Sequence, residues 1–128
     1  MSINRRTIGL AAIAPACLVL ALCAATVSAA STSPVARSSA SCTPPKYPGA
    51  GYFTGKIRVT NVTCTYAKSF VVAYYKCRTH SSLSGRCRSV RRFSCTERRV
   101  TIPTEIDARV TCKRGTQRIV HTYQQNLE

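Results

Sequence analysis

The chain has 128 residues, with 19 lysines and arginines against four acidic residues, so its formal net charge is +15. Four acidic residues offer no convincing pair of carboxylates for glycoside hydrolysis. The Cys-x2-Cys spacing of many zinc sites does not occur, and we expect no metal site and no cofactor. This composition favours a small basic protein that attracts anionic partners.

The first thirty residues differ in kind from the rest of the chain. Arg5 and Arg6 precede an apolar run over residues 8–25, and the small residues 27–30 follow that run. The order of positive, apolar and small residues is typical of a cleaved signal peptide, which we place at residues 1–30. A retained membrane anchor, twin-arginine export and lipid attachment to a leader cysteine are the weaker alternatives. We therefore expect a secreted or cell-wall-associated protein without a retained transmembrane segment.

Removal of this leader changes the charge and the cysteine count. It takes away Arg5 and Arg6, so 17 basic residues face four acidic ones and the net charge becomes +13. Six cysteines remain, namely Cys42, Cys64, Cys77, Cys87, Cys95 and Cys112. An even number of cysteines in a small exported domain indicates a disulfide framework, and six cysteines allow fifteen pairings.

Composition divides the mature chain into a lead-in and one domain. Residues 31–41 are rich in Ser and Ala and have no apolar period, so we expect a disordered lead-in. Residues 42–128 follow as a single basic, disulfide-rich domain, which begins with an extended arm rich in proline and glycine.

The first half of this domain predicts a strand followed by a helix. Polar and apolar residues alternate over residues 55–62, as in a strand with one buried face. Apolar residues at helical spacing then predict a helix over residues 64–76. Either Asn61 or Thr63 is suited to cap its N-terminus.

The second half predicts three strands, over residues 93–100, 106–113 and 117–124. Residues 114–116 form a short connection suited to a hairpin, whereas residues 101–105, with Pro103, predict a looser one. The expected fold class is α+β, with one helix packed on a small antiparallel β-sheet and stapled by disulfides.

Spacing favours one of the possible disulfides. Cys77 and Cys87 close the shortest loop that a bridge could plausibly span, from the end of the helix to the approach of the next strand. Cys64 could then reach Cys95, and Cys42 could reach Cys112. The expected pairs are Cys77–Cys87, Cys64–Cys95 and Cys42–Cys112.

Short motifs around the cysteines occur in a recognisable order. They are Asn61-Val62-Thr63-Cys64, Tyr75-Lys76-Cys77, Gly85-Arg86-Cys87, Phe93-Ser94-Cys95, Val110-Thr111-Cys112 and Val120-His121-Thr122-Tyr123. This set resembles a family of small secreted six-cysteine proteins from high-GC Gram-positive bacteria. The resemblance implies an exported, disulfide-stapled α+β domain and carries no activity or site.

Clustered arginines form the most informative candidate for a binding site. The candidates are Arg86, Arg88, Arg91, Arg92, Arg98 and Arg99. Guanidinium groups bind phosphate, sulfate and carboxylate through paired donors, so the expected partner is an anionic polymer or surface, such as teichoic acid, anionic lipid or nucleic acid. Alternation along the strands leaves open whether these arginines form one patch, and charge that serves solubility alone is the competing interpretation.

Two other hypotheses compete with this non-enzymatic interpretation. His80 and His121 could act as the acid and base of a metal-free ribonuclease, with a nearby cation that stabilises the phosphorane. Residues 78–86 could form a tethered loop that inhibits or antagonises a protein partner. We prefer polyanion binding because charge density is the stronger signal.

Overall fold

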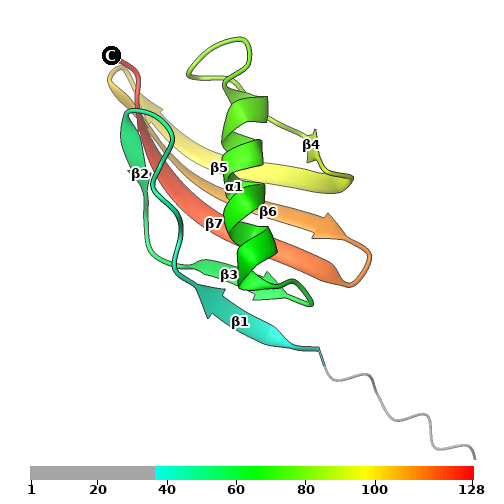
Figure 1. The fold of residues 1–128 in the computed structure, drawn as a ribbon. Coiled ribbons are helices and arrows are strands. Elements are labelled where there is room, and N and C mark those ends of the chain that lie inside the picture. Colours follow the sequence, from blue (N-terminus) through cyan, green and yellow to red (C-terminus); the bar gives the residue numbers. More distant parts are fainter. Residues whose placement is uncertain (1–36) are drawn as a thin grey trace, which may run out of the picture. The chain divides into compact units, whose positions relative to one another are not determined.

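The computed structural model describes residues 37–128, so the predicted signal peptide and residues 31–36 lie outside the described part. Within it, one helix lies across one side of a curled antiparallel β-sheet (Figure 1). Strands account for 47% of these residues and helix for 16%. The helix-on-sheet arrangement agrees with expectation, but the sheet dominates and is larger than predicted.

Seven strands and one helix follow each other within residues 37–128. They are β1 (Ser39–Cys42), β2 (Gly51–Phe53), β3 (Ile57–Thr60), α1 (Cys64–Arg78), β4 (Ser89–Val90), β5 (Phe93–Ile102), β6 (Glu105–Arg114) and β7 (Gln117–Asn126). The strand order in the sheet is β1-β3-β7-β6-β5-β4. Because β2 also pairs with β7, β2 and β3 lie one after the other along the same edge of β7.

The three C-terminal strands form the centre of the sheet and are longer than expected. Ile102 pairs with Glu105, so only two residues turn the chain between β5 and β6, where we predicted a looser connection. Arg114 pairs with Gln117 in the expected short hairpin between β6 and β7. Gly115 has a φ of 54°, a left-handed conformation that glycine adopts without steric cost.

The helix begins where the sequence predicted and ends two residues later. The side chain of Thr63 caps it by accepting a hydrogen bond from the backbone N–H of Tyr66. The helical spacing of its apolar residues brings Ala67, Phe70, Val71 and Tyr74 into the core. The predicted apolar face of the helix is therefore confirmed.

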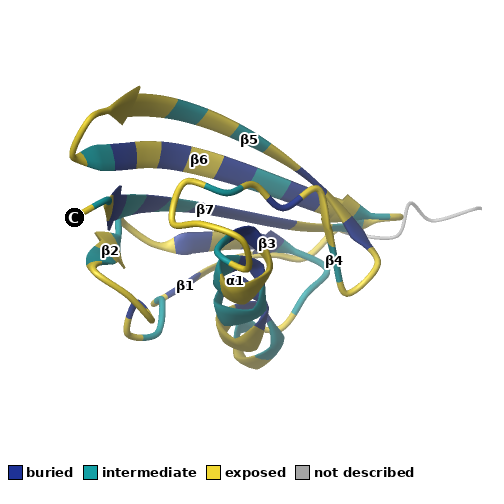
Figure 2. Cartoon of the chain, turned by 90° about the horizontal axis from the view of Figure 1, so that it is seen from above, coloured by how far each residue is buried: buried dark blue, intermediate teal, exposed yellow. Residues whose placement is uncertain are grey.

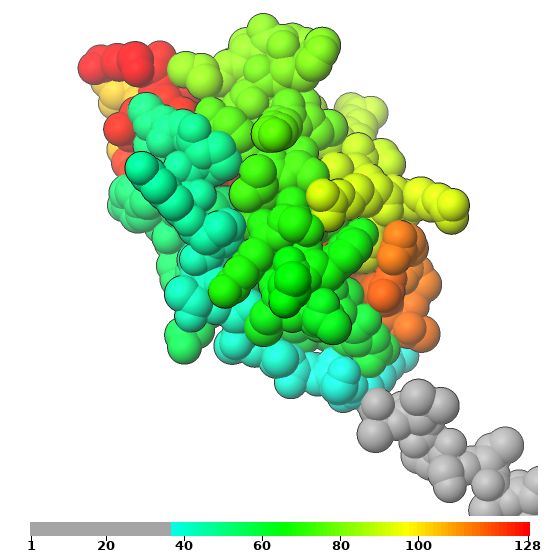
Figure 3. Space-filling view, viewed as in Figure 1, coloured from blue at the N-terminus to red at the C-terminus, as the bar shows by residue number. Residues whose placement is uncertain are grey.

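Alternation along the strands gives the sheet two different sides. Figure 2 shows buried and exposed residues alternating along β6, as the period of two requires. We call the side that packs against α1 the helix side and the other the open side. The helix-side core includes Ile57, Phe93, Val110, Ile119 and Tyr123. In Figure 3, side chains of α1 fill the middle of the face seen there, so the helix covers this side of the sheet.

Part of the predicted lead-in is an ordered strand. β1 pairs with β3 from Ser39↔Thr60 to Cys42↔Ile57, and Ser38 exchanges hydrogen bonds with Asn61. The sequence shows no apolar alternation here because β1 is an edge strand in which only Cys42 is buried. The predicted disorder is thus wrong for residues 39–41.

Two of the three expected disulfides are also wrong. Cys77–Cys87 forms as predicted, but Cys42 pairs with Cys64 and Cys95 with Cys112. The tight hairpin explains the last pair, because its register places Cys95 directly opposite Cys112 with their Cα atoms 4.1 Å apart. Cys42–Cys64 ties β1 to the first turn of α1.

Candidate functional site: a basic groove on the open side of the sheet

Cations outside the predicted cluster gather on the open side of the sheet. Arg58 of β3, Arg118 of β7 and Arg109 of β6 occupy exposed positions that alternate with core residues. Lys113 of β6 lies on the same side, directly opposite Arg118. Strand alternation alone therefore places four positive side chains on one surface that α1 does not cover.

Three adjoining depressions make this surface a groove. The central depression has a volume of about 370 Å³ and is lined by Arg58, Arg109 and Arg118 together with hydroxyls of β1 and β3. A second depression shares Arg58 with it and adds Lys56, and a third shares Arg118 and adds Arg37 and Lys113. We call this the basic groove and define it by six exposed cations and no acidic residue: Arg37, Lys56, Arg58, Arg109, Lys113 and Arg118.

The groove cations have no partner among the described residues. None of the six side chains donates a hydrogen bond or forms an ion pair within residues 37–128, where the one ion pair joins Arg99 to Glu97. The register also sets like charges against each other, since Lys113 pairs with Arg118 and Arg109 pairs with Arg98. Like charges directly opposite in neighbouring strands destabilise a sheet.

The six predicted arginines do not form one patch. Arg99 faces the helix side, and its side chain is only 7% exposed. Arg91 lies in the β4–β5 turn, donates to the Ser69 hydroxyl and covers the ring of Tyr66. Arg86 donates to the carbonyl of Glu97. Arg88, Arg92 and Arg98 are exposed, and of these only Arg98 is directly opposite a groove residue.

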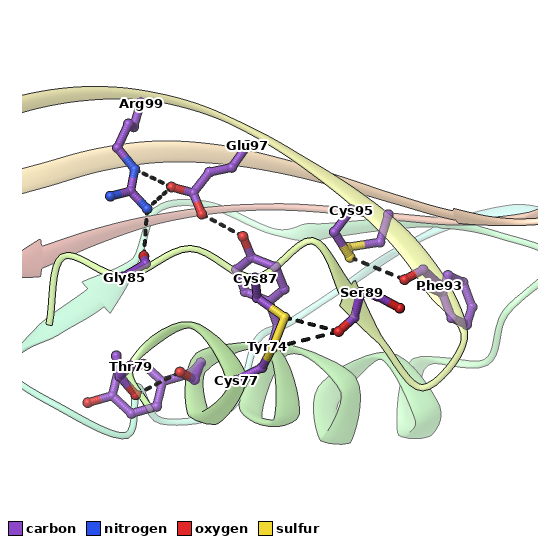
Figure 4. The surroundings of a disulfide bond; sticks show 12 residues. Tyr74, Cys77, Thr79, Gly85, Cys87, Ser89, Phe93, Cys95, Glu97 and Arg99 are labelled. Carbon is purple, nitrogen blue, oxygen red and sulfur yellow. Dashed lines mark hydrogen bonds and ion pairs between the residues drawn. A yellow bond between two sulfur atoms is a disulfide. The ribbon is translucent and has the colours of Figure 1, made fainter. Parts of the chain in front are cut away.

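Arg99 serves the structure of the loop that follows α1. Figure 4 shows its guanidinium between Glu97 and Gly85, and it donates to the carbonyls of Ser84 and Gly85. Glu97 in turn accepts from the hydroxyl of Tyr74. Burial and this bond raise the pKa of Tyr74. These contacts anchor the loop and leave Arg99 unavailable to a ligand.

Arg78, the last residue of α1, is buried in a cluster of polar groups. Its guanidinium donates to the hydroxyl of Tyr47, to the side-chain carbonyl of Gln125 and to the backbone carbonyl of Leu83. It also lies 4.4 Å from the ring centre of Tyr123. Burial raises the pKa of Tyr47, although the nearby Arg78 charge opposes this shift.

The two histidines are in unlike environments. His80 is exposed in the loop after α1, whereas His121 is buried on the helix side between Phe53, Tyr74 and Tyr123. Burial, with a smaller contribution from the Arg78 charge, lowers the pKa of His121 to about 3. His121 is therefore neutral and shielded from solvent, an arrangement that gives the ribonuclease hypothesis no support.

The loop that we considered as a protein inhibitor is rigidly anchored. The Cys77–Cys87 disulfide closes the loop. The guanidinium groups of Arg78 and Arg99 donate hydrogen bonds to its backbone carbonyls. Arg78 itself is buried, so an exposed loop begins only after it, with Leu83 40% exposed near its tip. Contact of this loop with a protein partner remains a prediction.

The comparisons with known proteins identify no relative: no family model, no curated protein and no solved structure matches the chain. Within residues 37–128, no three His, Cys, Asp or Glu side chains come together in a group that could hold a metal ion. The helix in this part of the chain is not long and apolar enough to cross a membrane.

Reasoning from the sequence missed the groove because its cations are scattered along the chain. Arg37 and Arg118 are 81 positions apart, and the strand order brings them together. The high density of arginines along residues 86–99 led us to predict the binding site there instead, but several of those arginines have structural partners. The sequence did contain one usable signal. In the predicted strands, Arg58, Arg109 and Lys113 alternate with apolar residues, which places them on the side away from the core.

Proposed function

We propose that this protein is a secreted, non-enzymatic α+β domain that binds an anionic polymer along the basic groove. Six exposed cations without an acidic neighbour in the groove would attract and hold a chain of anionic groups. Arginine suits this task because its planar donors engage phosphate or sulfate in pairs. Three disulfides support a location in an oxidising compartment outside the cell.

One observation carries the proposal: unpartnered like charges face each other across neighbouring strands. Lys113 opposite Arg118 and Arg109 opposite Arg98 weaken the sheet that contains them. An anion that contacts both members of a pair would turn this repulsion into attraction. A surface that only served solubility would have no need to concentrate unpaired cations in a depression.

The experiment measures binding of the oxidised protein to labelled single-stranded RNA across a salt series. If about six cations contact the polymer, the logarithm of the association constant should fall with the logarithm of salt concentration with a slope of about −4. The variant Arg58→Gln/Arg118→Gln should bind roughly tenfold more weakly and have a slope smaller by about 1–2.

A matched control separates the groove from net charge. Arg88→Gln/Arg92→Gln removes the same two charges from exposed positions outside the groove, and should change the affinity by less than about twofold. Equal weakening by both variants would show non-specific attraction and contradict the proposal. RNA that is cut, with cutting lost in His80→Ala or His121→Ala, would also contradict it and establish an enzyme.

A further inference from the structure

We infer that the natural ligand of the basic groove is a phosphodiester polymer whose linking units are hydroxylated and carry no aromatic rings. This inference rests on the proposed function and names the class of polymer. Nucleic acid, lipid surfaces and polyols joined by phosphates all present phosphates, so the other groups that line the groove must distinguish them.

The groove provides no platform on which a base could stack. Single-stranded nucleic acids are usually held by aromatic side chains that stack on successive bases. None of the residues that line the three depressions is Phe or Tyr, and His121, which borders the second depression, is only 2% exposed. Nearly all the aromatic rings of residues 37–128 pack in or against the core. The exception is Tyr52, which is 55% exposed and pairs with Gln124 on the open side, beyond the groove.

Hydroxyl groups line the groove in place of aromatic rings. Ser39 and Ser41 of β1 and Thr60 of β3 line the central depression among its arginines. Their side chains make no hydrogen bond to another described residue, so they are free to donate to and accept from a ligand. Cations for phosphates and hydroxyls for a polyol fit a polymer that alternates these two groups.

The distribution of charge on the open side also defines the path of the polymer. Asp107 and Glu105 occupy the same side of β6 at its opposite end, near the β5–β6 turn. They would repel a polyanion that ran beyond the groove towards that end of the sheet. A path along β3 and β7 through the three depressions instead meets all six groove cations and no carboxylate. A path confined to this groove suits a flexible single chain rather than a flat membrane.

Three labelled oligomers with equal numbers of phosphates test the inference: oligo(dT), an abasic phosphodiester oligomer and oligo(glycerol phosphate). The abasic oligomer should bind the oxidised protein within about twofold of oligo(dT), because the bases make no contact. Oligo(glycerol phosphate) should bind several-fold more tightly than both. Tyr52→Ala should leave all three affinities unchanged.

The variant Ser41→Ala/Thr60→Val separates hydroxyl recognition from charge. It should remove the preference for oligo(glycerol phosphate) while the abasic oligomer binds as before. Oligo(dT) that binds tenfold more tightly than the abasic oligomer, with the excess lost in Tyr52→Ala, would overturn the inference in favour of nucleic acid and leave the groove intact as a polyanion site. Binding of all three oligomers that is indifferent to Arg58→Gln/Arg118→Gln would overturn the proposed function itself.

Discussion

Arginine has two different roles in this protein, depending on whether its side chain is buried or exposed. Arg78 is buried and the side chain of Arg99 is only 7% exposed, and both guanidinium groups donate hydrogen bonds to hydroxyl, carbonyl or carboxylate oxygens. A buried guanidinium without such partners would be strongly destabilising, so these contacts are structural. Arg58 and Arg118 are exposed and have no partner among the described residues, which makes them available to a ligand.

Burial also determines the protonation state of His121. Tyr74 of α1, Phe53 of β2 and Tyr123 of β7 surround its ring, and Arg78 is the charged group that acts on it. The buried Nδ1 atom has no hydrogen-bond partner among residues 37–128. Protonation would place a second positive charge near buried Arg78, away from the solvent surface, so the folded protein keeps this imidazole neutral.

We predict that His121 makes the protein less stable in acid. Its pKa is about 3 when folded and near 6.5 when unfolded, so only the unfolded chain gains a proton between these values. Stability should fall as the pH drops from about 6.5 towards 3, by about 5 kcal/mol over the whole range and about 3 kcal/mol by pH 4 from this group. Urea unfolding at pH 7 and pH 4 measures the difference.

The variant His121→Phe, which fits among aromatic rings, should lose most of this pH dependence. His80→Gln removes an exposed histidine and serves as the control that retains it. An unchanged difference between pH 7 and pH 4 in His121→Phe would show that other groups cause the acid sensitivity.

At the scale of elements, hairpin register determines both the cross-strand disulfide and the cationic pairs. A two-residue turn between β5 and β6 places Cys95 opposite Cys112 and Arg98 opposite Arg109. A shift of one residue would exchange the two sides of β5 and bury its polar positions. The disulfide therefore holds the register that also places Arg98 beside the groove.

The β4–β5 turn is built from residues that suit its conformation poorly. Arg91 and Arg92 have φ angles of 49° and 64°, as two-residue hairpin turns of the type I′ kind require. Such turns favour Asn and Gly because a Cβ atom is strained at positive φ. Arg91 has compensating contacts with Ser69 and Tyr66. Arg92 makes no side-chain hydrogen bond among the described residues.

We predict that Arg92→Gly stabilises the protein relative to Arg92→Ala by about 1 kcal/mol. Both variants lose the same charge and the same long side chain, and they differ only in the Cβ atom that is strained at this φ. Thermal unfolding of the two variants side by side gives the comparison. If Arg92→Ala were the more stable, the left-handed conformation would not govern this turn.

Taken together, residues 37–128 form a sheet with one side covered by α1 and one exposed, charged side. Only the helix side supplies a continuous core, and the excess of positive charge opposes compaction. Three disulfides offset this weakness by connecting β1 to α1, the end of α1 to the segment before β4, and β5 to β6. The unpaired cations of the proposed binding surface can persist on such a scaffold because covalent links hold it.

We predict that reduction of the disulfides unfolds the protein at room temperature. Each link contributes roughly 2–4 kcal/mol, which is a large part of the stability of a domain of this size. Circular dichroism melts with and without a reducing agent measure the effect, and free-thiol titration verifies that reduction is complete. A fully reduced sample with an unchanged melting curve would refute the prediction.

Local patterns in the sequence determined much of the fold. Periodicity placed the helix at its true start and predicted the strands that became β3, β5, β6 and β7, because these segments bury one face and must alternate accordingly. The same logic failed for β1, β2 and β4. Those strands are short and largely exposed, so backbone pairing and a disulfide hold them without an apolar pattern.

The candidate site depended almost entirely on the tertiary structure. Sequence alone established a strong positive charge, six cysteines after the predicted leader and the outward phase of several cations. It did not reveal which arginines are buried, because Arg78 and Arg99 find their partners far along the chain or across the sheet. Strand order brought distant cations into one groove, and hairpin register chose the cysteine partners. Both are long-range pairings that no local pattern encodes.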